Sequence, residues 1–407
     1  MIPTVYEKLN FAVGGRAELE KAPIMPPRAL FEPRCVELLQ ELSERLLHED
    51  RTQYPDLIAL GFFLRRAHLE ALLKSYASLK DRALGLGVVF HSSPSNVPAN
   101  FAYSLVAGLL AGNVNLVRLP RLAFPQTAII CAHLRELLAM ERFKPLRPYC
   151  VLFSYASDRE VTDAISAVSD ARIVFGGDEN IERLRQSPLK VRGRELNFAD
   201  RYSLSLINAA HVLSLNSQGR GELIAGLYND LYLNDQNACS SPVALVLVGR
   251  EGERAASLLC EGLASLADRR YPLAGRQTLA KLEQLLVAAA ENKEGTLDYV
   301  PLSGHSLALL RADVKSTDFD LSRFKGHSGL LYVFTVEHLE EVGALCSERL
   351  QTVTYAGFKG EELRALVIKE RWRGVDRIVR VGRALDFGFT WDGIDLIRAL
   401  SREIAVD

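Results

Sequence analysis

Short apolar segments alternate with segments of helical periodicity along the middle of the chain. Four apolar runs predict strands, at 86–90, 114–119, 149–153 and 172–175. The segments between them predict helices, and the helix expected over 99–111 ends at Gly112-Asn113, a common C-terminal signal. This alternation is typical of a parallel, doubly wound α/β sheet, in which ligands bind at the carboxyl ends of the strands.

A second alternation of the same kind begins near residue 233. It predicts strands at 243–248, 307–310 and 330–334, and helices at 254–266, 277–291 and 337–349. The first 80 residues are helical and charged. The pattern therefore divides the chain into a helical N-terminal region at 1–82, an α/β region at 83–232, a second α/β region at 233–385 and a C-terminal segment at 386–407.

The composition is that of an ordinary globular protein. Of the 407 residues 48% are hydrophobic, and 49 Lys plus Arg balance 50 Asp plus Glu. This balance gives no electrostatic reason to bind nucleic acid or an anionic membrane. No apolar run approaches the roughly 20 residues of a membrane span, and the first residues lack a secretory signal pattern. Six cysteines without a CxxC pair indicate free thiols in a reducing compartment, so we expect a cytoplasmic protein.

Several common catalytic motifs are absent from the sequence. It contains no G-x-x-x-x-G-K-[ST] phosphate loop, no H-E-x-x-H zinc motif, no G-x-S-x-G elbow and no G-x-G-x-x-G after a strand. The eight histidines show no ligand spacing, so we expect no metal site.

Two loops after predicted strands contain residues that suit catalysis or cofactor binding. Asn96, in Ser95-Asn96-Val97-Pro98, can aim its amide at a developing oxyanion, an interaction that contributes roughly 2.7–4 kcal/mol to catalysis. An isolated Asn-x-Pro is also common in ordinary turns. In Gly176-Gly177-Asp178 the glycines allow the backbone to approach a phosphate at a helix N-terminus. The alternative is a plain turn with Asp178 as the helix cap.

Cys239 lies in a polar loop immediately before a strongly apolar strand. A thiolate attacks carbonyl carbon readily and suits thioester chemistry. Cys131 and Cys260 lie in apolar helical runs and are expected in the core. No histidine is adjacent to Cys239, so nothing local indicates a cysteine–histidine protease pair, and an ordinary loop cysteine remains the alternative.

The order of these features resembles the aldehyde dehydrogenase superfamily. The segments that carry the resemblance are Ser92–Pro98, Ala107–Pro120, Phe175–Asp178 and Cys239. They are similar to that family's Pro-x-Asn-aromatic-Pro loop, its Ala-x-Gly-Asn-x-Val-x-x-Lys-Pro stretch, its Phe-Thr-Gly-Ser turn and its nucleophilic cysteine. A closer resemblance is to the long-chain fatty acyl-CoA/acyl-protein reductases of bacterial bioluminescence operons. It rests on Asn115–Pro120, Phe198–Ser203, Asn234–Pro242 and Trp391–Ile397.

The resemblance implies an aldehyde dehydrogenase-like α/β fold, with two doubly wound domains and an active-site cleft between them. Residues 83–232 would be a Rossmann-like NAD(P)-binding domain, 233–385 the catalytic domain, and 386–407 a segment returning to the cofactor domain or to an oligomer interface. Cys239 is the expected nucleophile, and the Asn96 amide and the Cys239 N–H would hold the oxyanion. The expected cofactor-binding residues are Ser95, Arg118, Arg121, Phe175, Gly176, Gly177 and Asp178.

Two departures from the family pattern refine the expected reaction. Aldehyde-oxidising members carry Glu-Leu-Gly-Gly-Lys, whose Glu activates water, whereas the corresponding stretch 198–202 lacks a Glu unless a register shift places Glu195 there. Without this base, hydrolysis of an acyl-enzyme would be slow, which favours transfer to or from a thiol. Arg118 replaces the usual lysine of the cofactor loop and, with Arg121, suits a 2′-phosphate and thus NADPH, the alternative being surface charges.

We therefore expect an acyl-thioester reductase that converts a fatty acyl-CoA or acyl-carrier thioester to an aldehyde through a cysteine-bound acyl intermediate. NADPH is the expected cofactor, with NADH as the alternative. His91 and His327 are candidate proton donors by residue type alone. We expect a homo-oligomer, and an acyl-activating or acyl-transferring protein is a candidate partner. Two other interpretations stay open: a cysteine acyltransferase or thioesterase without redox chemistry, and a non-catalytic scaffold subunit.

Overall fold

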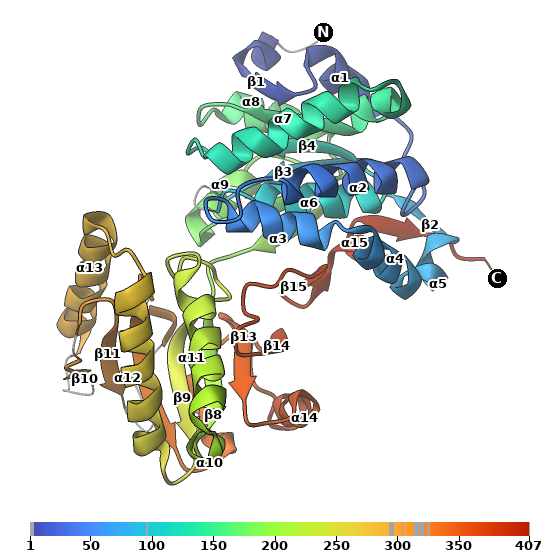
Figure 1. The fold of residues 1–407 in the computed structure, drawn as a ribbon. Helices are drawn as coiled ribbons and strands as arrows, with labels where there is room; N and C mark the ends of the chain where they lie inside the picture. The colour runs from blue at the N-terminus through green and yellow to red at the C-terminus, as the bar shows by residue number, and fades with distance from the viewer. Residues whose placement is uncertain are drawn as a thin grey trace. The chain divides into compact units, whose positions relative to one another are not determined.

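A computed structural model describes residues 4–94, 97–292, 297–302, 304–312, 321–323 and 326–406. The chain separates into two compact units, each built around its own sheet (Figure 1). The first unit is Met1–Ala199 together with Ile394–Asp407, and the second is Asp200–Gly393.

The described part of the first unit contains a six-stranded sheet in the order β1-β5-β4-β3-β6-β7. The strands are β1 (Asn10–Val13), β3 (Val88–Ser92), β4 (Val114–Arg118), β5 (Cys150–Ser154), β6 (Ala171–Phe175) and β7 (Arg194–Phe198). All are parallel except β1 at the edge. From β3 the chain moves outward through β4 to β5, then crosses to β6 on the other side of β3. The strand order thus reverses between β3 and β6, and doubly wound folds bind ligands at the carboxyl end of such a switch point.

Helices connect the strands of this sheet. The helices between the parallel strands are α6 (Asn100–Leu110), α7 (Pro125–Ala139), α8 (Arg159–Val168) and α9 (Asp178–Arg185). Between β1 and β3 lie α1 (Arg16–Lys21), α2 (Pro33–Leu47), α3 (Pro55–Phe63), α4 (Arg66–Ser75) and α5 (Ala77–Lys80). Gly112 follows the end of α6, as the sequence predicts, and has φ +83°. A Cβ at this position would lie 2.2 Å from the Arg28 carbonyl oxygen, so glycine is required.

The last residues of the chain return to the first unit. β17 (Ser401–Glu403) pairs antiparallel with β2 (Ala83–Gly85), and the short helix α15 (Leu396–Ala399) precedes it. Asn113 fixes this arrangement, because its amide donates to the Leu400 carbonyl at 2.9 Å while its side-chain oxygen accepts from the Leu86 N–H at 2.7 Å.

The described segments of the second unit contain a seven-stranded sheet in the order β10-β11-β12-β9-β8-β13-β14. The strands are β8 (Tyr202–Asn208), β9 (Pro242–Val248), β10 (Leu297–Val300), β11 (Ala308–Ala312), β12 (Leu330–Val336), β13 (Leu350–Ala356) and β14 (Arg377–Arg380). Only β10 is antiparallel to its neighbour among these strands. The helices are α10 (Ala209–Ser214), α11 (Ser217–Tyr232), α12 (Gly252–Arg270), α13 (Gly275–Glu291) and α14 (Gly360–Glu370). Alternate residues of β9 enter two cores, one on each face of the sheet.

The observed units divide the chain at Ala199 and Asp200, whereas the sequence pattern placed the division at 232/233. The reason is β8, which pairs with β9 and β13 in the second sheet. β8 has no continuous apolar run because Ser203 and Ser205 interrupt it, although both hydroxyls are buried and hydrogen-bonded. The helix expected over 337–349 is wrong: this segment is a 3₁₀ helix limited to Leu339–Leu345.

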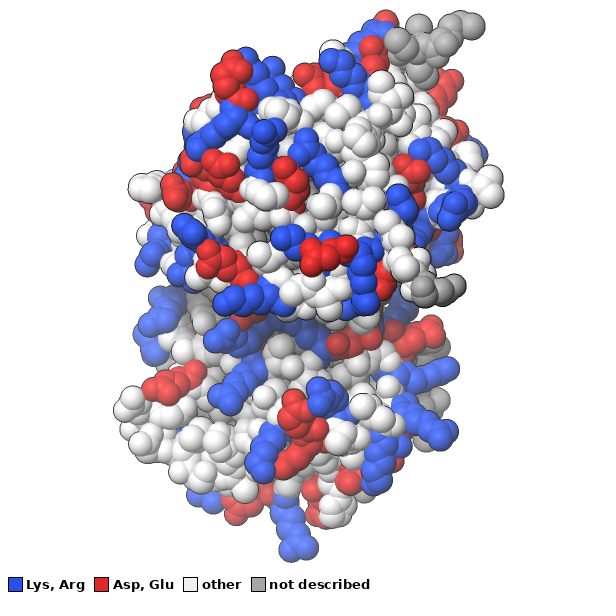
Figure 2. Space-filling view, turned by 90° about the vertical axis from the view of Figure 1, so that its right-hand side faces the viewer, with Lys and Arg blue, Asp and Glu red and all other residues white. Residues whose placement is uncertain are grey.

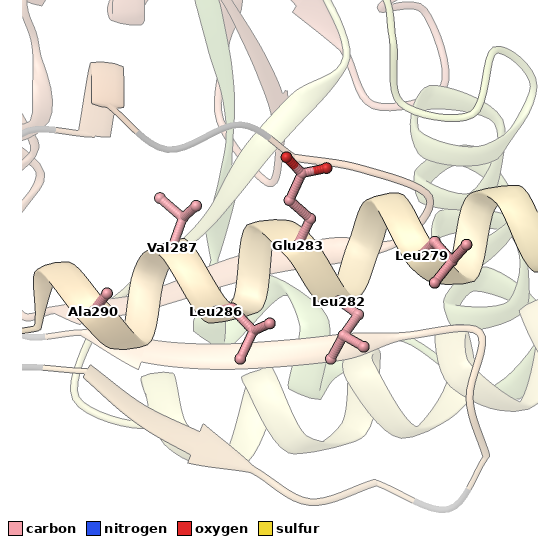
Figure 3. Close-up of a pocket in the computed structure, with 6 residues that line it drawn as sticks. All are labelled: Leu279, Leu282, Glu283, Leu286, Val287 and Ala290. Atoms are coloured by element: carbon pink, nitrogen blue, oxygen red, sulfur yellow. The ribbon is translucent and has the colours of Figure 1, made fainter.

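α13 presents apolar side chains to the surface. Leu279 and Leu286 are 69% and 62% exposed and, with Leu282, Val287 and neighbouring side chains, line a shallow pocket (Figure 3). Lys281, on the opposite side of the helix, is buried.

Positive and negative side chains are interspersed on the face seen in Figure 2. Ion pairs of the described residues include Lys8 with Asp158 at 2.7 Å and Arg16 with Glu20 at 2.7 Å. This mixture agrees with the formal net charge of −1.

Candidate active site

Cys239 lies just before β9, where the amino ends of three parallel strands of the second unit meet. The Ser203 hydroxyl, at the start of β8, donates a hydrogen bond to the Cys239 carbonyl oxygen at 2.7 Å. The same hydroxyl accepts from the Thr352 N–H of β13 at 3.1 Å. The main chain of Cys239 is thus fixed by the two neighbouring strands, while its side chain is partly exposed.

The other five cysteines are poorly suited to attack a substrate. Burial raises the pKa of Cys35, Cys131, Cys260 and Cys346 to about 12, and it also raises the pKa of Cys150. Cys346 is the only one of these five that is not fully buried, and its thiol donates to the Val342 carbonyl at 3.5 Å. None of the six cysteines, all of which lie in described segments, is in a disulfide. The core positions expected for Cys131 and Cys260 are confirmed.

Gln236 braces the chain that leads to Cys239. Its side-chain amide donates to the carbonyls of Pro242 and Leu330 at 2.8 and 2.9 Å, and its oxygen accepts from the Gly329 N–H at 3.0 Å. Gln236 has φ +60°, and the preceding Asp235 has φ +51°. Non-glycine residues in this region cost of order 1–3 kcal/mol and are concentrated at functional sites. Sequence reasoning missed Gln236, because its polar neighbours mark only a loop.

A buried lysine supports the other side of this loop. The Lys281 ammonium donates to the carbonyls of His305, Ser306 and Ser328 at 2.6, 3.1 and 3.2 Å. Burial lowers the pKa of Lys281 to about 8. The Ser328 N–H in turn donates to the Asp235 carbonyl at 3.1 Å. The segment before β12 is therefore held both by Lys281 and by the chain that precedes Cys239.

The carboxyl edge of the first sheet contains most of the expected cofactor residues. Gly176 follows β6 and donates its N–H to the Phe198 carbonyl at 3.2 Å. The Phe175 and Phe198 rings stack with centroids 4.6 Å apart. Gly177 caps α9 and a Cβ there would have no atom within 4 Å, so the space in front of the helix is open. α9 begins at the exposed Asp178, which is therefore its first residue rather than its cap.

Arg118 ends β4 at the same carboxyl edge. Its guanidinium carbon lies 4.1 Å from the centroid of the Tyr155 ring. Its carbonyl accepts from the Ser93 N–H at 3.3 Å, so the end of β4 lies beside the loop that follows β3. Arg121 is exposed. Ser95 and Asn96, in that same loop, lie outside the described residues.

Several polar groups at this edge could hold parts of a nicotinamide cofactor. Among the described residues, no carboxylate pairs with Arg118, and the buried Ser93 hydroxyl has no hydrogen-bond partner. An uncompensated guanidinium and an unsatisfied hydroxyl at the switch point suit the phosphates and hydroxyls of a nicotinamide cofactor. The N–H groups at the start of α9 add a further place for a phosphate.

His91 is not the proton donor that its residue type suggested. It is fully buried, its Nε2 lies 3.0 Å from the Asn115 side-chain oxygen, and its Nδ1 lies 2.6 Å from the Ser104 hydroxyl. The Asn115 amide donates to the carbonyls of Asn113 and Tyr149, so its oxygen accepts from His91 Nε2–H and Nδ1 accepts from Ser104. Burial lowers the pKa of His91 to about 4, so the ring is neutral. His327, before β12, remains a candidate.

Glu195 does not supply the water-activating base. Arg172 and Arg185 both form ion pairs with it, and the Arg172 Nε lies 2.9 Å from its carboxylate. The Asn197 amide also donates to it at 2.8 Å. These hydrogen bonds lower the pKa of Glu195, against the opposing effect of burial. Glu195 is therefore a structural carboxylate within β7.

The sequence family follows from a model match that covers most of the chain. The family model described as acyl-CoA reductase (LuxC) matches residues 60–403. The chain belongs to the LuxC acyl-CoA reductase family. This membership identifies it as an oxidoreductase that acts on fatty acyl thioesters. Among curated protein sequences no relative matches the chain.

Solved structures place this LuxC-family chain in the aldehyde dehydrogenase fold. A NAD-dependent benzaldehyde dehydrogenase from Corynebacterium glutamicum is similar with TM-score 0.62 and 14% identity, over 99% of this chain and 89% of that one. Aldehyde dehydrogenase 21 from Physcomitrella patens, in complex with succinate, gives TM-score 0.65 and 10% identity, over 95% and 87%. A Sinorhizobium meliloti protein, described as a methylmalonate-semialdehyde dehydrogenase complexed with NAD, gives 0.62 and 16%, over 95% and 86%. The predicted fold is confirmed.

Within the described ranges, no group of three or more His, Cys, Asp and Glu side chains is arranged to hold a metal ion. No helix in that part of the chain is both long and apolar enough to cross a bilayer.

Proposed function

We propose that this LuxC-family acyl-CoA reductase forms an aldehyde from an acyl thioester with NADPH, through an acyl group carried on Cys239. The observation that carries the proposal is the setting of Cys239. Its carbonyl is fixed by Ser203, and Gln236 and Lys281 brace the surrounding segments, whereas Cys239 itself is only half-buried. Preorganisation of this kind is what a nucleophile needs, because reacting groups must be held close to productive geometry.

The proposed reaction has two steps at Cys239, acylation of the thiol and release of the aldehyde. The thiolate attacks the acyl carbon, a carbon–sulfur bond forms, and the CoA or carrier thiol leaves with a proton. The Asn96 amide and the Cys239 N–H hold the oxyanion that develops. The nicotinamide, when bound, supplies a hydride to the acyl carbon. Cys239 then leaves that carbon as thiolate, and the carbonyl of the free aldehyde forms.

Hydrolysis of the acyl group is disfavoured by the state of Glu195. Its carboxylate is shared between Arg172 and Arg185, so its lone pairs are occupied. A carboxylate with a lowered pKa is also a weak base. Both points support reduction over thioester hydrolysis and weigh against the thioesterase interpretation.

The preference for NADPH is supported by Arg118. Its charge is not neutralised by a described carboxylate, and it lies at the end of β4 beside the switch point. Arg121, three residues later, adds a second exposed positive charge. NADH remains the alternative cofactor. We further propose a cytoplasmic homo-oligomer that receives its acyl group as acyl-CoA or from an acyl-carrying partner protein.

The decisive experiment follows NADPH absorbance and intact protein mass with a panel of acyl-CoA thioesters. Thioester-dependent NADPH oxidation and an acyl adduct on Cys239 are expected, and both should be lost in Cys239→Ala. Cys346→Ala, which removes the other half-buried thiol, should retain both. Unchanged turnover in Cys239→Ala would overturn the mechanism. An adduct without NADPH oxidation would indicate an acyltransferase. The absence of both the adduct and NADPH oxidation would indicate a scaffold.

A further inference from the structure

The guanidinium of Arg118 stacks on the face of the Tyr155 ring. The guanidinium carbon lies 4.1 Å from the ring centroid, and Tyr155 itself is only 7% exposed. Tyr155 directly follows β5, and Arg118 ends the adjacent strand β4, so both lie at the carboxyl edge of the first sheet. Stacking of this kind is worth about 0.5–2 kcal/mol, depending on desolvation.

The Tyr155 ring is itself held in place by contacts with neighbouring side chains. The Thr162 hydroxyl donates to the Asp158 carbonyl at 2.9 Å, so the Tyr155 hydroxyl, at 3.0 Å, donates to Thr162. Thr162 lies in the first turn of α8, whose cap is Asp158. The Phe153 ring also contacts Tyr155, with centroids 6.1 Å apart. Tyr155 is therefore a rigid platform rather than a mobile surface ring.

A stacked arginine differs from an ion-paired arginine in one respect that matters for phosphate binding. A carboxylate partner would neutralise the guanidinium and occupy its N–H groups. An aromatic ring leaves both the charge and the N–H groups of the guanidinium available. The ring stacks on the flat face of the guanidinium, whereas the N–H groups point outward in its plane. The guanidinium keeps its charge and has a fixed plane, which is the geometry that a bidentate phosphate contact requires.

We propose that Tyr155 is a specificity-positioning residue, which orients Arg118 toward the 2′-phosphate of NADPH and so sets the preference for NADPH over NADH. This inference rests on the proposed function, because it assumes that the cofactor binds at this edge. Tyr155 acts through Arg118 and contributes no contact of its own to the phosphate. Its effect should therefore appear with ligands that carry the 2′-phosphate and not with ligands that lack it.

The test is a binding measurement that needs neither thioester nor turnover. Calorimetry on the full chain compares 2′,5′-ADP, which carries the phosphate, with 5′-AMP, which does not. Tyr155→Met and Tyr155→Leu should each weaken the binding of 2′,5′-ADP by about two- to thirtyfold, the range that corresponds to loss of a cation–π contact. Both variants should bind 5′-AMP as the wild type does. Tyr155→Phe, which keeps the ring and removes only the hydroxyl, should stay within about twofold for both ligands.

A double-mutant cycle separates positioning from a general structural role. In an Arg118→Met background, Tyr155→Met should have no further effect on 2′,5′-ADP, because there is no guanidinium left to orient. Equal weakening of both ligands, or an additive loss in the Arg118→Met background, would overturn the proposal for Tyr155. If the wild type itself does not distinguish the two ligands, the NADPH preference fails and the Tyr155 proposal falls with it. Absence of thioester-dependent turnover would instead overturn only the proposed reaction.

Discussion

The hydroxyl of Ser203 holds the carbonyl of Cys239 at 2.7 Å. Because Ser203 is the second residue of β8 and its hydroxyl also accepts a hydrogen bond from the Thr352 N–H of β13, the peptide after Cys239 is tied to the centre of the second sheet. Two residues further along β8, Ser205 makes a similar buried hydroxyl contact with Thr354 at 2.6 Å. Both serines are thus buried in β8, and both hydroxyls form hydrogen bonds with β13. Ser203 differs from Ser205 because its hydroxyl also donates a hydrogen bond to the Cys239 carbonyl.

Ser203→Ala should slow acylation of Cys239 by about tenfold. The substitution removes one hydrogen bond and leaves the buried Thr352 N–H unsatisfied, a cost of about 1–3 kcal/mol that falls on the position of Cys239. Single-turnover acylation, measured by intact mass after mixing with acyl-CoA, reports this step directly. Ser205→Ala is the matched control, which should lower the free energy of unfolding and leave the acylation rate unchanged. Equal acylation rates in the two variants would show that Ser203 does not position Cys239.

Gln236→Leu should destabilise the second unit and release the segment that carries Cys239. The variant leaves two carbonyls and one N–H without their partner, with a combined cost of several kcal/mol. Urea denaturation should show a lower midpoint, and Cys239 should react faster with iodoacetamide in the folded state. Gln218→Leu, in the exposed first turn of α11, is the control. An unaltered midpoint would contradict the bracing role.

Lys281→Met should change how stability depends on alkaline pH. In the folded protein the pKa of Lys281 is lowered to about 8 from its usual 10.5, because of burial. Between these values the unfolded chain binds more protons than the folded one, so Lys281 contributes stability that increases as pH rises from 8 to 10.5. The difference in unfolding free energy between wild type and Lys281→Met should therefore grow across this interval. Lys359→Met, which removes an exposed lysine, should show no such trend. A constant difference from pH 8 to 10.5 would refute the shifted pKa.

Periodicity predicted the parallel strands of both sheets because their apolar runs are buried on both faces. It missed the parallel strands β7, β8, β13 and β14. The sequences of β7 and β8 mix Glu195, Asn197, Ser203 and Ser205 with apolar residues. Each of these polar side chains has a hydrogen-bond or ion-pair partner in the fold. The partners of Ser203 and Ser205 come from distant parts of the chain, so no local pattern reveals them, and the division at Ala199 was missed with β8.

The candidate site was predictable only where residue type alone implies chemistry. Cys239 stood out in this way, whereas Arg118 was named only through the family resemblance. Gln236, Lys281 and Tyr155 did not, because a glutamine in a loop, a lysine in a helix and a tyrosine after a strand are all common on surfaces. Their roles arise from carbonyls, N–H groups and a guanidinium that tertiary packing brings to them. For the same reason His91 was overestimated as a proton donor, since its burial is invisible in the sequence.

His91→Gln should make the first unit less sensitive to acid without changing the pH profile of catalysis. The pKa of His91 is lowered from 6.5 to about 4 by burial, so the unfolded chain takes up a proton in this interval and the folded chain does not. Stability is therefore lost as pH falls from 6.5 to 4, by up to about 3 kcal/mol for a shift of this size. Glutamine keeps a donor for Asn115 and cannot be protonated, so the variant's unfolding free energy should fall less steeply across this range. The control is His133→Gln, at a partly exposed histidine paired with Glu49. This variant keeps His91, so its unfolding free energy should still show the decrease between pH 6.5 and 4 that His91 causes in the wild type. A loss of the acidic limb of the rate profile in His91→Gln would restore His91 as a proton donor, against its neutral, enclosed position.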